Sequence, residues 1–132
     1  MRDVAQLREL VEVATAKLST LSRMLSDAHD DLTRSEERWH ELYDAVAEVL
    51  AEEYREAGRK SDPAEHTIES ATRRRHRVEF GAWRKAKREV QMLEKIATNR
   101  CAELSGYQSE LSVERSLMER GSDGADHMPA SR

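Results

Sequence analysis

The chain has 132 residues, enough for one domain, and its charged residues (36%) are nearly as frequent as its apolar ones (38%). This composition, with only 5% aromatic residues, argues against a compact multilayer core and favours long helices that each bury one apolar stripe. The net charge is −4 but uneven, because residues 1–57 hold 14 acidic against 7 basic side chains and residues 58–100 hold 12 basic against 6 acidic.

The first predicted helix covers residues 3–57. When heptads are counted with Val4 at position a, every a and d position up to Val49 is apolar except Ser35. An apolar repeat of this length predicts a coiled-coil helix. Gly58 suits the position just after a helix end, where a left-handed backbone is common.

A turn is predicted over residues 58–62 and a second helix over residues 63–120. Ser61 or Asp62 can cap this second helix, and Pro63 suits its first turn. Residues 121–132 are rich in Gly, Ser and Asp and predict a disordered tail. The fold class expected is therefore all-α.

A short turn between long helices predicts an antiparallel coiled-coil hairpin. With the turn centred near Ser61, residue i should face residue 122−i, which places Trp39 opposite Trp83. Apolar residues off this seam widen the apolar face beyond what one hairpin covers, and we expect a homo-oligomer, most simply a dimeric four-helix bundle. The alternative is that these side chains are simply exposed. The predicted oligomer interface consists of Leu10, Val13, Met24, Tyr43 and Leu50.

The most distinctive feature is a basic run that begins at Arg73 and continues along the second helix. On one continuous helix most of these cations fall on a line that faces solvent, where they could engage successive phosphates. Phe80 lies close by and could stack on a base. Alternatively, the cations could dock onto an acidic partner or form a plain solvated face. The predicted contact residues are Arg73, Arg74, Arg77, Arg84, Lys85, Arg88 and Lys95.

No motif predicts catalysis. Glu37 and His40 have the Glu-x-x-His spacing of carboxylate-bridged di-iron bundles, but such a site needs a second unit of the same kind. The chain has no Gly-rich phosphate loop, no Gly-x-Ser-x-Gly elbow and no Cys-x-x-Cys pair. We therefore expect no enzymatic activity, no metal, no cofactor and no small-molecule substrate.

The cellular setting expected from the sequence is the cytoplasm. The single cysteine, Cys101, excludes an intrachain disulfide and fits a reducing compartment. The N-terminal residues are too charged for a signal peptide, and no stretch approaches the roughly 20 apolar residues that span a bilayer. No membrane contact is expected.

Two stretches carry a resemblance to a known group of proteins. Residues 58–68 read Gly-Arg-Lys-Ser-Asp-Pro-Ala-Glu-His-Thr-Ile, and the second stretch runs from Trp83 to Ser112 and ends Ala-Glu-Leu-Ser-Gly-Tyr-Gln-Ser-Glu-Leu-Ser. This pattern resembles small helical accessory proteins of bacteriophages and prophages that are found near recombination or replication functions. The resemblance implies no catalytic residues and favours a protein of the host cytoplasm that assists DNA transactions, with DNA or a DNA-bound protein as partner. The alternative is a scaffold, chaperone or inhibitor that binds another protein and no nucleic acid.

Overall fold

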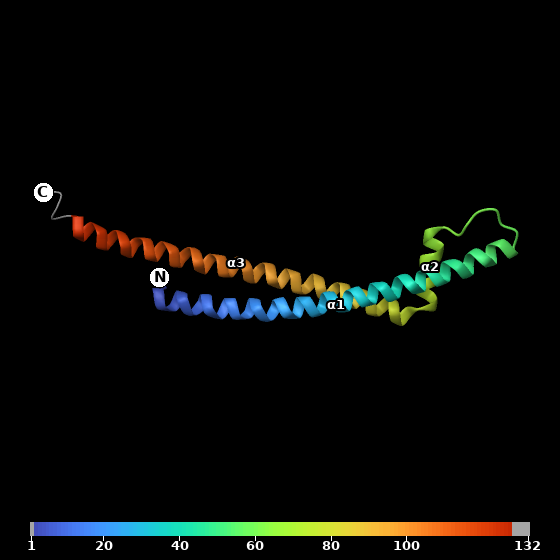
Figure 1. Ribbon diagram of the computed structural model, residues 1–132, viewed down its shortest axis with the longest axis horizontal. Helices are drawn as coiled ribbons and strands as arrows, with labels where there is room; N and C mark the ends of the chain where they lie inside the picture. Colours follow the sequence, from blue (N-terminus) through green and yellow to red (C-terminus); the bar gives the residue numbers. More distant parts are fainter. Residues whose placement is uncertain (1, 128–132) are drawn as a thin grey trace. The chain divides into compact units, whose positions relative to one another are not determined.

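Every secondary-structure element in the described part of the chain is a helix. The structure is a computed structural model that describes the backbone of residues 2–127 and the side chains of residues 2–120. The helices are α1 (Val4–Glu56), α2 (Glu65–Arg75) and α3 (Arg77–His127) (Figure 1). The all-α class is thus confirmed. Two compact units divide the chain: unit 1 combines Met1–Met24 with Leu93–Arg132, and unit 2 is Leu25–Met92.

Helix α1 buries the seam that the heptads predicted. Every a and d position is buried or half-buried except Val49, which is 45% exposed. Its neighbour Leu50 is only 9% exposed and takes its place. A straight helix drifts about 20° per heptad from a strict seven-residue repeat, so six heptads move the buried position by roughly one residue. The seam therefore shifts where α1 approaches its end.

Helix α1 ends in a Schellman motif, as the glycine predicted. Gly58 has φ +73°, and its N–H donates to the carbonyl of Arg55 at 3.0 Å. The N–H of Arg59 donates to the carbonyl of Tyr54 at 2.9 Å. Glycine adopts this left-handed conformation without the steric cost of a Cβ. The Arg59 guanidinium lies 4.3 Å from the centre of the Tyr54 ring, where an apolar contact usually accompanies the motif.

Helix α2 starts later than predicted and without a side-chain cap. Its N-cap residue is Ala64, which makes no side-chain hydrogen bond to the helix, so the assignment of Ser61 or Asp62 as the cap was wrong. Pro63 precedes the cap instead of lying in the first turn. The first half-buried side chains of the helix are Thr67 and Ile68. Packing, and not the cap, therefore decides where α2 begins.

The predicted second helix is broken at His76. His76 has φ −128° and ψ 56°, while its N–H still donates to Thr72 and its carbonyl accepts from Phe80. The joint has no Gly or Pro, the residues that usually mark a kink. In an unbroken helix, Arg77 would lie above Arg73 and Arg74, and like charges at these spacings destabilise a helix. The break keeps the hydrogen bonds from His76 to Thr72 and from Phe80 to His76, but none from the N–H groups of residues 77–79 to the carbonyls of residues 73–75.

In unit 2, α2 lies beside the C-terminal half of α1 (Figure 1). Thr72 is fully buried, and its hydroxyl donates to the carbonyl of Ile68 at 2.7 Å. Tyr43 of α1 is half-buried, and burial, followed by the charges of Glu65 and Glu69, raises the pKa of its phenol. Leu50 is buried within the protomer, so its assignment to an oligomer interface was wrong.

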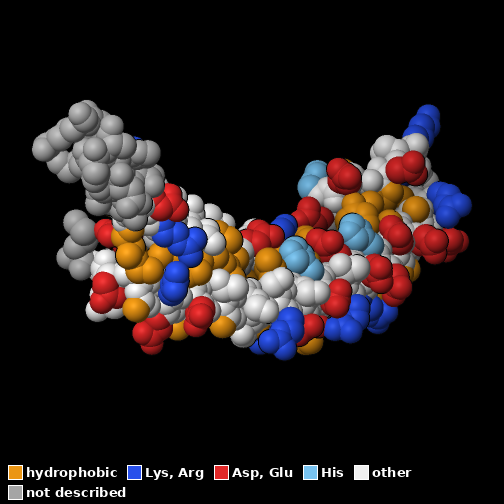
Figure 2. All heavy atoms as spheres, turned by 60° about the vertical axis from the view of Figure 1, so that its left-hand side comes forward, with side chains coloured by type: hydrophobic (Ala, Val, Ile, Leu, Met, Phe, Trp, Pro, Cys, Tyr) orange, Lys and Arg blue, Asp and Glu red, His pale blue; other side chains and the backbone are white. Residues whose placement is uncertain are grey.

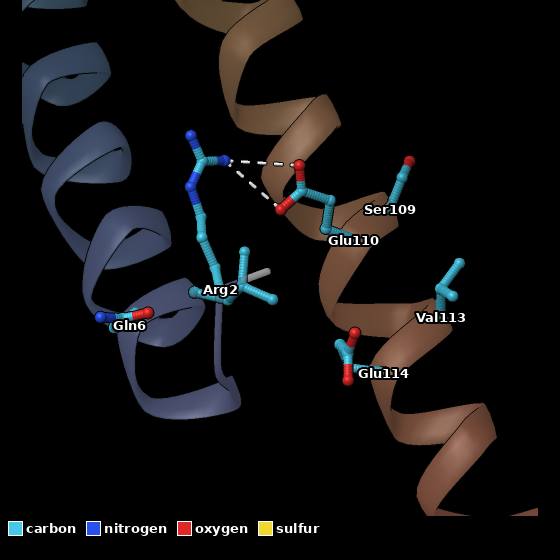
Figure 3. A pocket seen from close by; sticks show the side chains of 7 residues that line it. Arg2, Gln6, Ser109, Glu110, Val113 and Glu114 are labelled. Atoms are coloured by element: carbon cyan, nitrogen blue, oxygen red, sulfur yellow. Dashed lines mark hydrogen bonds and ion pairs between the residues drawn. The ribbon is translucent and has the colours of Figure 1, made fainter.

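In unit 1, the start of α1 lies beside the C-terminal part of α3 (Figure 1). Arg2 forms an ion pair with Glu110 at 3.3 Å (Figure 3), and its guanidinium lies 5.3 Å from the Tyr107 ring centre. The register predicted Arg120 as the residue facing Arg2, so this contact departs from the register. Arg2 precedes the first helical residue, Val4, and a long side chain in that position is not held to the helical spacing.

Helix α3 continues to His127, beyond the predicted end at Arg120. Of the predicted tail, residues 128–132 lie outside the described residues. Within the described chain, none of the helices combines the length and the apolar character needed to cross a membrane.

Candidate nucleic-acid interface

A hollow of about 440 Å³ in unit 2 brings basic and aromatic side chains together. We call it the basic hollow. The break at His76 places its lining residues on two helices, α2 and α3. It is lined by Glu69, Arg73, Phe80, Trp83, Arg84, Lys87, Arg88 and Gln91.

Two aromatic rings, Phe80 and Trp83, line the hollow and contact a third, Trp39. Trp39 of α1 stacks on Trp83 with ring centres 5.7 Å apart and planes 8° from parallel, so the facing pair that the register predicted is confirmed. The Phe80 ring centre lies 5.1 Å from that of Trp39 and 6.1 Å from that of Trp83. Such aromatic contacts stabilise a fold by about 0.5–1.5 kcal/mol each beyond the area they bury. The two half-buried rings that line the hollow are therefore packed against the buried Trp39 of α1.

Three cations lie over these rings. The guanidinium carbons of Arg73 and Arg84 are 4.9 Å and 5.6 Å from the centre of Phe80. The Lys87 ammonium is 5.1 Å from the centre of Trp83. A cation within about 6 Å of a ring face is attracted by the negative charge of that face. The rings therefore hold the cations in place at the hollow.

One carboxylate competes for the cations. Glu69 forms an ion pair with Arg73 one turn later on α2, and both side chains line the hollow. No acidic residue other than Glu69 lines it among the described side chains. The hollow therefore keeps a net positive charge.

The remaining cations of the predicted stripe lie elsewhere. Arg74, Arg77, Lys85 and Lys95 are exposed but do not line the hollow, and Lys95 belongs to unit 1. The stripe was predicted for one continuous helix, and the break at His76 divides it. The structure adds Lys87, Trp83, Glu69 and Gln91, which sequence reasoning had not placed in the site.

Lys87 belongs to the basic run of the sequence but was not predicted as a contact residue, although its spacing indicated that role. Lys87 follows Trp83 by four residues, as Arg84 follows Phe80, and side chains at that spacing meet on one helix face. Phe80 itself was predicted as an open stacking surface, but it is half-buried among two indoles and two guanidinium groups. That role for Phe80 does not fit its surroundings.

A second surface of interest lies in unit 1 and is apolar. Val13 and Met24 of α1 are 45% and 49% exposed, so these two predicted interface residues are open to solvent, whereas Leu10 is half-buried. On α3, Val113, Leu117 and Met118 are each more than half exposed. Figure 2 shows apolar side chains, drawn in orange, gathered on the surface of this part of the molecule. A hollow of about 760 Å³ lies between the two helices here, lined by Leu7, Glu110 and Val113 among others (Figure 3).

Other candidate sites gain no support from the geometry. Among the residues that the structure describes, no three His, Cys, Asp or Glu side chains come together as a metal site would require. Comparisons of the chain with protein-family models, with curated proteins and with solved structures gave no match. The basic hollow and the apolar surface of unit 1 are therefore the two candidate binding surfaces.

Proposed function

We propose that the chain binds nucleic acid through the basic hollow, and that it acts by binding and not by catalysis. The observation that carries this proposal is the convergence of Arg73, Arg84, Lys87 and Arg88 on one hollow. Because the whole chain is acidic, with a net charge of −4, a polyanion would be attracted by this local cluster and not by the overall charge.

The cations over the rings support the proposal energetically. A free Lys or Arg side chain loses up to about 2 kcal/mol of rotamer entropy when it is fixed against a ligand. Arg84 and Lys87 are already held over Phe80 and Trp83, so less of this entropy remains to be lost on binding. Arg73 is engaged by Glu69, which leaves Arg84, Lys87 and Arg88 as the main phosphate contacts.

The proposal predicts a defined salt dependence. Three phosphate contacts correspond to a slope of log K against log salt of about −2 for single strands and about −3 for duplex DNA. Fluorescence anisotropy with labelled 20-nucleotide single and double strands, at salt concentrations from low to physiological, measures this slope. If neither form binds the wild-type protein at low salt, the proposal is wrong.

A matched pair of triple variants locates the site. Replacing Arg84, Lys87 and Arg88 together by Ala should bring the slope close to zero. Replacing Arg8, Arg23 and Arg115 by Ala, three residues that are exposed and do not line the hollow, removes the same charge and should leave the slope unchanged.

The single variant Glu69→Gln should raise the affinity for nucleic acid a few fold, because it releases Arg73 from its ion pair. Far-UV circular dichroism checks that all variants keep their helicity.

The wider role that we propose follows the resemblance noted in the sequence. The chain would serve as a non-enzymatic accessory protein of phage type, in the host cytoplasm, during recombination or replication. Sequence-independent contact with a nucleic acid suits such a role, because an accessory protein must act wherever the process takes place. Identification of the neighbouring genes tests this setting directly.

We propose self-association as a second function, carried by the apolar surface of unit 1. Val13 and Met24 of α1 and Leu117 of α3 are about half exposed, although isolated hairpins normally present polar residues outside the seam. A second copy offers the same surface, so a twofold arrangement would cover both at once. The assembly we propose is an antiparallel hairpin that pairs into a dimeric helical bundle.

A further inference from the structure

We infer that the basic hollow recognises the phosphodiester backbone of a nucleic-acid strand and does not stack on its bases. This inference rests on the proposed nucleic-acid binding and specifies which part of the ligand the hollow contacts. It reverses the role that the sequence suggested for Phe80.

The surroundings of Phe80 argue against base stacking. Two guanidinium groups lie over this ring, at 4.9 Å and 5.6 Å from its centre, and the Trp39 ring lies 5.1 Å away. A base could reach the ring only by displacing Arg73 or Arg84. Arg84 is one of the main phosphate contacts proposed above, so a base that displaced it would remove part of the ionic contact.

Trp83 is occupied in a similar way. The Trp39 indole stacks on it nearly parallel, at 8°, and the Lys87 ammonium lies over the same ring at 5.1 Å. Single-strand binders that stack bases present open aromatic faces along a basic groove. In this hollow the faces of Phe80 and Trp83 contact other rings or cations, which leaves the charged side chains as the groups available to a ligand.

The cations themselves are arranged for phosphates. Arg84, Lys87 or Arg88, and Gln91 follow one another along α3 at helical spacing, which advances about 5.4 Å per turn. An arginine fork and an ammonium group both bind phosphate oxygens well, and Gln91 adds a neutral donor.

The test distinguishes binding to the sugar-phosphate backbone from binding to the bases. Anisotropy at low salt compares a 20-nucleotide thymidine strand with an abasic deoxyribose-phosphate strand of equal length and with a peptide nucleic acid that carries thymines on an uncharged backbone. We expect the abasic strand to bind within about threefold of the thymidine strand, and the uncharged strand not to bind.

The outcomes distinguish this inference from the proposed function. If the thymidine strand binds and the abasic strand is more than tenfold weaker, or if the uncharged strand binds, the backbone inference is overturned while nucleic-acid binding stands. If no strand binds, both are overturned. If the abasic strand matches the thymidine strand in the wild type and both lose affinity in the Arg84, Lys87 and Arg88 triple variant, the inference is supported at this hollow.

Discussion

At the scale of single residues, Glu103 of unit 1 is a carboxylate with two side-chain hydrogen-bond partners on its own helix. It accepts hydrogen bonds from Arg100 and from the Tyr107 hydroxyl, each at 3.1 Å. The bond from Arg100, followed by that from Tyr107, holds the pKa of Glu103 below its ordinary value of 4.5. The guanidinium of Arg2, at the start of the chain, lies over the ring of Tyr107, whose hydroxyl bonds to Glu103. The start of α1 and the C-terminal part of α3 are thus joined by charge.

This network predicts a pH dependence of stability. Since folding lowers the pKa of Glu103, its stabilising contribution is present above pH 4.5 and is lost as the pH falls through the folded-state pKa. The wild type should melt at a higher temperature than Glu103→Gln at pH 7, and the difference should shrink at pH 3. Thermal unfolding followed by circular dichroism measures both values.

The control for this prediction is Glu12→Gln, which removes the same charge from an exposed position of α1. Its melting temperature should differ little from that of the wild type at either pH, because exposed charges away from a partner contribute little. A Glu103→Gln difference that stayed constant between pH 7 and pH 3 would contradict the role assigned to the carboxylate.

At the scale of elements, α2 is the helix with the weakest local signals. It has 11 residues, below the length at which an isolated helix is stable in water, and its N-cap side chain makes no hydrogen bond. Its stability must come from packing, of which the fully buried Thr72 is the clearest sign. A better cap should therefore strengthen this helix without altering its contacts.

Ala64→Asp tests that expectation. An Asp at the N-cap accepts a hydrogen bond from a backbone N–H of the first turn, and the exchange of Ala for such a residue is worth about 1 kcal/mol. Chemical denaturation should show this gain in unfolding free energy. Ala82→Asp is the matched control, because it introduces the same side chain at an exposed position inside α3 and should cost up to about 0.7 kcal/mol. Equal effects at the two positions would refute the capping argument.

At the scale of the whole molecule, the sequence predicted best where one periodic signal dominates. The heptads gave α1 to within a residue at each end, and Gly58 marked its end because left-handed backbone is nearly specific to glycine. The Trp39 and Trp83 contact followed from the same register. Long elements whose local and tertiary preferences agree leave few alternatives.

The sequence predicted least where packing overrides local preference. The break at His76 follows no Gly or Pro, and the placement of Ala64 as a cap opposes its propensity. The basic hollow was foreseen through Arg73, Arg84, Arg88 and Phe80, whereas the contribution of α2 to its lining depends on that break. Glu69, for example, enters the site from a helix whose direction the sequence does not reveal.

Self-association is the prediction that belongs to this scale. The double variant Val13→Asp, Leu117→Asp places charges on the exposed apolar surface of unit 1 and should convert a dimer into a monomer in light scattering. The double variant Val78→Asp, Met92→Asp alters residues that are 82% and 55% exposed in unit 2 and should leave the mass unchanged. A monomeric wild type at all concentrations would rule out the dimer.

The position of Phe80 has a thermodynamic consequence for unit 2. Its ring contacts Arg73 of α2 and Arg84 of α3, so it joins the two helices across His76 at the hollow itself. A ligand that needs both guanidinium groups in place favours the angle between these helices that brings them together. Because such coupling is reciprocal, a substitution that loosens the bend at His76 should weaken binding of the ligand, and the bound ligand should in turn stabilise the bend.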